Sequence, residues 1–153
     1  MKNSYSNIFT FNKKILSKTI KSLKNGGVIG LPTETVYGLG GNAYSKKAVK
    51  KIFKLKGRPR FNPLIVHYYN IKDLEKDCKT NTLFYKLYNS LCPGPITFIL
   101  KLKNESKISK NVTNNKKTLG VRFPSHRTAR KLLKSLKYPL GILKCSLLFK
   151  LSI

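Results

Sequence analysis

Acidic residues are scarce in this sequence, with 5 Asp and Glu against 32 Lys and Arg, which leaves a formal net charge of +27. A compact fold carrying such an excess has a strong positive field, so anions are its natural ligands. Most of the excess is lysine spread along the whole chain. Selection for nucleic-acid binding and a plain compositional bias therefore explain it equally well.

Cysteine is also rare, and Cys78, Cys92 and Cys145 form no CxxC pair and have no histidine at metal-ligand spacing. This pattern excludes a disulfide framework and a zinc site, so we predict reduced thiols and no metal site. Long apolar runs are missing too, which excludes a secretory signal and a membrane span. From these absences we expect a cytoplasmic protein without a membrane partner.

The glycines match neither GxxxxGK[ST] nor GxGxxG, which excludes the two common nucleotide-binding loops. What is present is 41% hydrophobic residues in a chain of 153, enough for one core, with helical and strand periodicities that alternate along the chain. The alternation predicts a single α/β domain. The predicted helices are 12–24, 45–57, 70–74, 83–91 and 129–136; the predicted strands are 28–31, 64–67, 96–102 and 119–123; the predicted loops are 32–41 and 104–117.

Two segments indicate chemistry. Residues 32–40 (PTETVYGLG) follow a predicted strand, and residues 56–60 (KGRPR) form a basic cluster where a predicted helix ends. Arginine offers paired donors and lysine a point charge, so the cluster suits a phosphate. Residue types and spacing alone thus predict an anion-binding α/β domain and no particular reaction.

Five sequence blocks, taken together, resemble the YrdC/Sua5 family of threonylcarbamoyl-AMP synthases in order and spacing. The blocks are PTETVYGLG (32–40), KGRP (56–59), NPLIVH (62–67), PGPIT (93–97) and VRFP (121–124). The resemblance covers a partial YrdC-like domain over residues 9–140. It implies a twisted open mixed sheet with flanking helices and a basic cleft, incomplete at its C-terminal end.

The resemblance also implies a nucleotidyltransferase reaction, in which L-threonine, bicarbonate and ATP give threonylcarbamoyl-AMP and pyrophosphate. The product would serve threonylcarbamoyladenosine modification of tRNA, through downstream threonylcarbamoyl-transferase machinery. ATP would be a substrate, with Mg²⁺ as an optional companion, and no cofactor would be tightly bound. Phosphoryl chemistry of this kind depends on positioning and on cations over the phosphates.

The family's site residues carry over to seven positions here. By resemblance, Lys56 and Arg58 are catalytic, and Arg58, Asn62 and Thr118 contact ATP. Thr35, His67 and Arg122 contact L-threonine by the same resemblance. A planar guanidinium such as that of Arg122 is the better partner for the substrate carboxylate.

The family pattern stops after Leu140, where a Ser-x-Asn motif is expected and residues 141–147 read GILKCSL. When the sequence is aligned with the family pattern without a gap, Lys144 takes the place of the serine. Ile142 takes the place of a small residue beside threonine. We therefore predict a divergent tail over residues 141–153, as a frameshift or a truncated gene would give. A misplaced ligand costs on the order of a hundredfold in rate, so we expect little product from this chain.

Three other interpretations stay open at this point. The chain can be a noncatalytic protein of the same fold that binds tRNA or double-stranded RNA, or an inactive fragment. Other branches of the family transfer carbamoyl groups in metalloenzyme maturation, and the sequence fits them as well.

Overall fold

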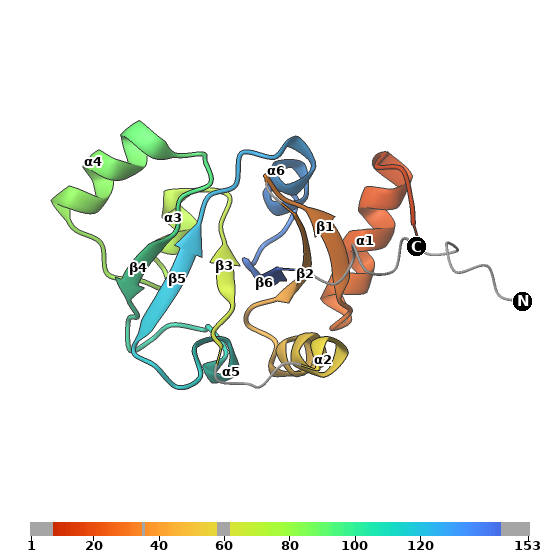
Figure 1. Cartoon of the computed structure of the whole chain (residues 1–153), viewed down its shortest axis with the longest axis horizontal. Coiled ribbons are helices and arrows are strands. Elements are labelled where there is room, and N and C mark those ends of the chain that lie inside the picture. The colour runs from red at the N-terminus through yellow and green to blue at the C-terminus, as the bar shows by residue number, and fades with distance from the viewer. Residues whose placement is uncertain (1–7, 35, 58–61, 145–153) are drawn as a thin grey trace, which may run out of the picture.

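The computed structural model describes residues 8–34, 36–57 and 62–144. Within these ranges the strands form one mixed, open sheet of six in the order β1-β2-β6-β3-β5-β4, with helices packed around it (Figure 1). The strands are β1 (Ile29–Pro32), β2 (Tyr37–Asn42), β3 (Ile65–His67), β4 (Phe98–Lys101), β5 (Thr118–Arg122) and β6 (Leu140–Lys144). The helices are α1 (Lys13–Lys24), α2 (Lys46–Lys56), α3 (Ile71–Leu74), α4 (Thr82–Leu91), α5 (Lys110–Thr113) and α6 (Arg127–Lys134). The α/β class is confirmed.

The four helices α1 to α4 each begin where a short polar side chain caps them. Asn12 accepts a hydrogen bond from the backbone N–H of Ile15, and Ser45 accepts one from Ala48. Each satisfies an N–H that the first helical turn leaves free. α2 ends at Gly57, which has a left-handed φ of 56° that glycine adopts at little cost. The capping residues thus determine where α1 begins and where α2 begins and ends, close to the predicted boundaries.

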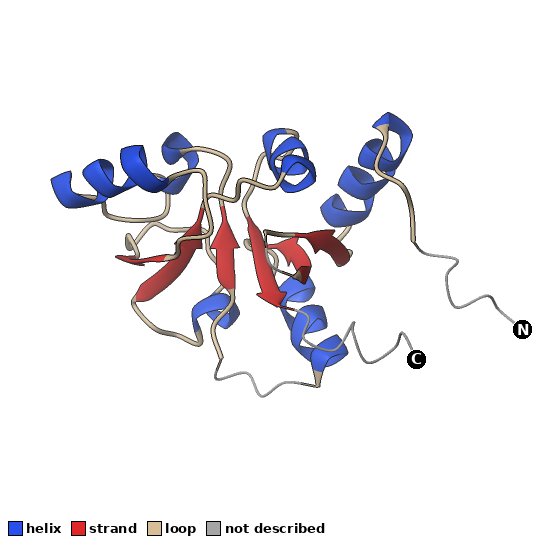
Figure 2. Ribbon diagram, turned by 45° about the horizontal axis from the view of Figure 1, so that its top comes forward, coloured by secondary structure: helices blue, strands red, loops and turns tan. Residues whose placement is uncertain are grey.

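Two buried clusters cover opposite faces of the sheet. Neighbouring residues of β6 point to opposite faces, so Ile142 packs with α1 and α6, and Leu143 packs with α2 to α5. Figure 2 shows α1 and α6 on one side of the β1–β2–β6 part of the sheet and α2 on the other. Ile99 of β4 lies on the same face of the sheet as Ile142 and is 68% exposed. The cluster that contains Ile142 therefore does not extend over β4.

The prediction of a loop over residues 32–41 is wrong in part, because β2 occupies residues 37–41 and pairs with both β1 and β6. Its glycines indicate close packing rather than a turn. A Cβ on Gly38 would collide with the Ile142 side chain, and one on Gly40 would lie 3.0 Å from the Leu31 side chain. Glycine is the residue that lets strands approach this closely.

The predicted loop over residues 104–117 is wrong in part, because α5 lies within it. Val112 of α5 is completely buried, and the nearby Ile108 is 8% exposed. Many lysines and asparagines surround these two apolar residues, so the sequence pattern did not indicate this helix of one turn. α5 packs against α2, and both lie at the bottom of the view in Figure 1.

β6 crosses the predicted boundary between residues 140 and 141. It lies in the centre of the sheet, antiparallel to β2 on one side and to β3 on the other. The division into 9–140 and 141–153 stays a prediction, and residues 145–153 of the proposed tail lie outside the described ranges. In the described part of the chain, no helix is long and apolar enough to cross a bilayer.

Candidate threonine-binding site

A cavity of about 170 Å³ lies over β3, β5 and β6, and we call it the β3–β5–β6 cavity. Its walls are Thr33, Pro63, Ile65, His67, Arg122, Ile142, Leu143 and Lys144. Carbon atoms form most of the surface, with a few polar groups among them. This composition is typical of a site for a small ligand that is oriented by a few contacts.

The parallel pairing of β3 with β5 brings the two polar side chains together. His67 lies opposite Arg122 in the register, and both are flanked in sequence by core residues. Because side chains alternate along a strand, Val66 and Val121 enter the core while His67 and Arg122 face the cavity. The apolar strands therefore fix both polar residues on one rigid surface.

Arg122 is a buried cation, only 7% exposed. Its Nε and Nη2 donate to Thr97 Oγ1 at 3.2 and 2.9 Å, and its Nη1 lies 4.0 Å from Glu34 Oε2. A guanidinium has five N–H donors, so these contacts orient the group and leave donors free. Such a group is suited to binding a carboxylate through two parallel hydrogen bonds.

His67 is 3% exposed and keeps a neutral ring. Burial lowers the pKa of His67 to about 4, with the positive charge of Arg122 acting in the same direction. Its Nδ1 lies 3.2 Å from the carbonyl oxygen of Ile65, which can only accept, so Nδ1 carries the proton. Nε2 is then a buried acceptor, and it has no hydrogen-bond partner among the residues that the structure describes.

Glu34, which the sequence analysis gave no role, lies beside this site and is not one of the residues that line the cavity. It belongs to the loop between β1 and β2, and its Oε2 comes within 4.0 Å of Arg122. Its Oε1 accepts hydrogen bonds from the backbone N–H and the hydroxyl of Ser125. Burial raises the pKa of Glu34, but hydrogen bonds from its own backbone, Ser125 and His126 outweigh burial and lower the pKa. The carboxylate is thus ionised. The one sequence signal was an acidic residue inside a signature block of a very basic chain.

The structure brings together only part of the predicted site. His67 and Arg122 both line the β3–β5–β6 cavity, and their predicted contacts with threonine stay predictions. Thr118 is exposed at the other end of β5, about 13 Å from Arg122 by strand rise. Thr35 and Arg58 lie outside the described residues.

Lys56 and Asn62, on either side of the undescribed residues 58–61, do not line the cavity. Lys56 is half-buried at the last turn of α2, and Asn62 is exposed before β3. The predicted ATP contacts therefore stay predictions.

The two β6 residues that depart from the family pattern are both in the cavity wall. Ile142 is 4% exposed and pairs with Gly40 on one side and Ile65 on the other. Lys144 is exposed at the end of the strand. An aliphatic side chain and an ammonium thus stand where the family resemblance implies a small residue and a serine.

A second cavity, of about 180 Å³, lies between α2 and α5. Its lining residues are Lys50, Phe53, Lys110, Asn111, Asn114 and Asn115. Both lysines are exposed, and none of the predicted site residues borders this cavity. The β3–β5–β6 cavity is the better candidate site, because it contains a buried cation and a buried acceptor without a partner.

Comparison with known proteins identifies the family. The Sua5/YciO/YrdC family model, described as telomere recombination, matches residues 21–149. The chain belongs to this family. A threonylcarbamoyl-AMP synthase of Bacillus subtilis is 38% identical over 135 residues, covering 85% of this chain. One of Pyrococcus abyssi is 40% identical over 120 residues, covering 78% of this chain.

A solved structure of a family member shows the same fold. P. abyssi Sua5 complexed with L-threonine has a TM-score of 0.80 at 33% identity and covers 88% of this chain. The predicted YrdC-like sheet is thereby confirmed. The chain spans 38% and 35% of the lengths of the B. subtilis and P. abyssi synthases, and 39% of the P. abyssi Sua5 structure.

Proposed function

We propose that this chain provides the L-threonine-binding part of a threonylcarbamoyl-AMP synthase. The observation that carries the proposal is a buried guanidinium with free donors beside a buried imidazole acceptor without a partner, in a cavity sized for a small molecule. Support comes from relatives that are named threonylcarbamoyl-AMP synthase and from a Sua5 structure complexed with L-threonine.

The carboxylate, the hydroxyl and the methyl group of L-threonine each have a counterpart in the β3–β5–β6 cavity. The carboxylate pairs with Arg122, whose orientation Thr97 fixes. The side-chain hydroxyl donates to His67 Nε2, a buried acceptor that has no partner in the described part of the chain. The methyl group packs against the aliphatic wall, which includes Ile65 and Ile142. A buried polar site of this kind rejects ligands that leave its groups unpaired.

In the reaction proposed for the family, the protein contributes mainly by positioning the substrates and less by supplying a nucleophile of its own. The threonine amine combines with bicarbonate to give a carbamate and water. A carbamate oxygen attacks the α-phosphorus of ATP, and the bond to pyrophosphate breaks. Cations stabilise the negative charge that gathers there, the role we propose for Lys56 and Arg58, with Asn62 and Thr118 as further ATP contacts.

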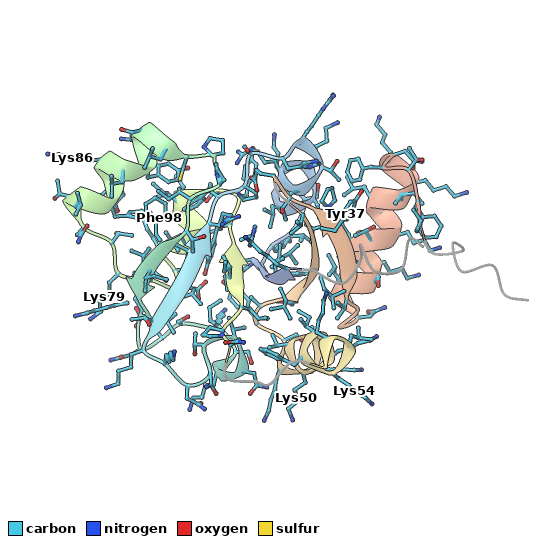
Figure 3. All side chains as sticks on the ribbon, viewed as in Figure 1. Tyr37, Lys50, Lys54, Lys79, Lys86 and Phe98 are labelled. Carbon is cyan, nitrogen blue, oxygen red and sulfur yellow. The ribbon has the colours of Figure 1, made fainter. Side chains whose placement is uncertain are left out.

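The product is an activated threonylcarbamoyl group that must be passed on. We propose that a threonylcarbamoyl-transferase consumes it to modify an adenosine of tRNA. A second candidate function, RNA binding without catalysis, is favoured by the lysines of α2. Figure 3 shows Lys50 and Lys54 pointing away from the sheet, where a phosphate backbone could meet them. Such binding would weaken steeply with salt, whereas threonine binding would not.

Calorimetric titration of L-threonine tests the proposal. The substitution Arg122→Lys keeps the charge but loses the paired donors, so we expect affinity for L-threonine to fall at least about tenfold. Arg127→Lys, at an exposed arginine of α6, is the matched control and should bind like the wild type. Absence of L-threonine binding by the wild-type chain would refute the proposal, and equal binding by both variants would remove Arg122 from the site.

A further inference from the structure

The two carboxylate oxygens of Glu34 have very different surroundings. Oε1 accepts two hydrogen bonds from Ser125, whereas Oε2 is buried and accepts none from residues 8–34, 36–57 and 62–144. Buried polar atoms in proteins are nearly always hydrogen-bonded, and an ionised oxygen without a partner is costly. The Nη1 of Arg122, 4.0 Å away, lies too far for a hydrogen bond. Oε2 therefore has an unused capacity to accept.

Oε2 is not the only unused acceptor in this region. His67 Nε2 is also buried without a partner, and the charge of Glu34 raises the pKa of His67 while that of Arg122 lowers it. The three groups thus lie close enough to influence one another. Together they offer one cation with free donors, one anion with a free acceptor and one neutral acceptor.

This set is complementary to an α-amino acid that carries a hydroxyl group. We propose that Glu34 Oε2 binds the α-ammonium group of the amino-acid substrate, while Arg122 binds its carboxylate. The 4.0 Å between Nη1 and Oε2 suits two opposite charges borne by the same carbon atom. The assignment rests on the proposed function, and it adds a residue that discriminates amino acids from hydroxy acids.

The hydrogen bonds between Glu34 and Ser125 position Glu34 to bind the ammonium group. They keep one oxygen occupied and hold the side chain against the β5–α6 connection, so the other oxygen is fixed beside Arg122. A fixed carboxylate loses little conformational freedom when the ligand arrives. A different role is that Glu34 merely orients Arg122. The two roles differ in what they predict for a ligand without an amine.

The test compares L-threonine with 3-hydroxybutyrate, which keeps the carboxylate and the hydroxyl but lacks the amine. We expect the wild type to bind L-threonine at least about tenfold more tightly. Glu34→Gln keeps the shape and an acceptor for Ser125 but removes the charge. It should cost at least about tenfold in affinity for L-threonine and leave affinity for 3-hydroxybutyrate unchanged. Glu105→Gln, at an exposed glutamate, should change neither.

Three results would overturn the assignment. Equal weakening of both ligands by Glu34→Gln would mean that Glu34 acts only through Arg122. Unchanged affinity for L-threonine in that variant would mean that Oε2 does not meet the amine. Should the variant fail to fold, equal affinity of the wild type for the two ligands would refute the assignment without it. If the wild type does not bind L-threonine, the proposed function itself is refuted.

Discussion

Acid should destabilise this protein through His67. The folded protein lowers the pKa of this ring from 6.5 to about 4 because the ring is buried. The unfolded chain therefore takes up the proton first as the pH falls. Stability from the neutral ring is complete above about pH 6.5 and is lost progressively between pH 6.5 and 4. At about 1.4 kcal/mol per pKa unit, the loss is about 2 kcal/mol at pH 5 and about 3 kcal/mol below pH 4.

Urea unfolding at a series of pH values from 7.5 to 4 measures this loss, with His67→Gln as the comparison. Glutamine removes the titrating ring, so the variant should show a much flatter dependence on pH over that window. Glu34, whose pKa is lowered, remains in the variant and accounts for any further loss at the acid end. A parallel loss of stability by the wild type and His67→Gln between pH 6.5 and 4 would refute the role of His67 in acid destabilisation.

Three other outcomes are expected. Asp77→Ala should lower the free energy of unfolding in urea by about 3 kcal/mol or more, because four donors lose the buried carboxylate that accepts their hydrogen bonds. Asp73→Ala, at a half-buried carboxylate that pairs with the exposed Lys76, should change it little. The donors to Asp77 are the hydroxyls of Tyr44, Tyr68 and Ser106 and the backbone N–H of Lys107. Lys56→Ala should weaken ATP binding about tenfold or more in calorimetry, while Lys50→Ala should not, and equal affinities would remove Lys56 from the ATP site. The 153-residue chain should release little pyrophosphate from ATP with L-threonine and bicarbonate, and Lys144→Ser should increase it; fast release by the wild type would show that Lys144 is harmless.

Local signals were sufficient for much of the fold. Asn12 and Ser45 each precede an apolar helical repeat, and a capping side chain acts within one turn, so the starts of α1 and α2 could be predicted. The apolar stretch of β3 is bounded by a proline and a polar segment, which indicated a buried strand. These features depend on neighbours in sequence.

Features that depend on distant partners could not be predicted from local sequence. Gly38 and Gly40 indicate a turn until Ile142, about a hundred residues later, is known to pack on them. The same holds for the site. His67 and Arg122 were found through the family resemblance, but the role of Glu34 depends on its contacts with Ser125 and Arg122 across the fold. A carboxylate in a loop is otherwise an ordinary solvated charge.

Nitrogen-15 NMR of the imidazole rings tests most directly whether L-threonine binds in the β3–β5–β6 cavity. The chain has two histidines, His67 and His126, so the spectrum contains few signals and each can be assigned by substitution. On titration with L-threonine, we predict a saturable shift of the Nε2 signal of His67, from a free acceptor to one that receives a hydrogen bond, and no shift of the His126 signals. Binding of L-threonine that leaves the His67 signals unchanged would contradict this account of the site.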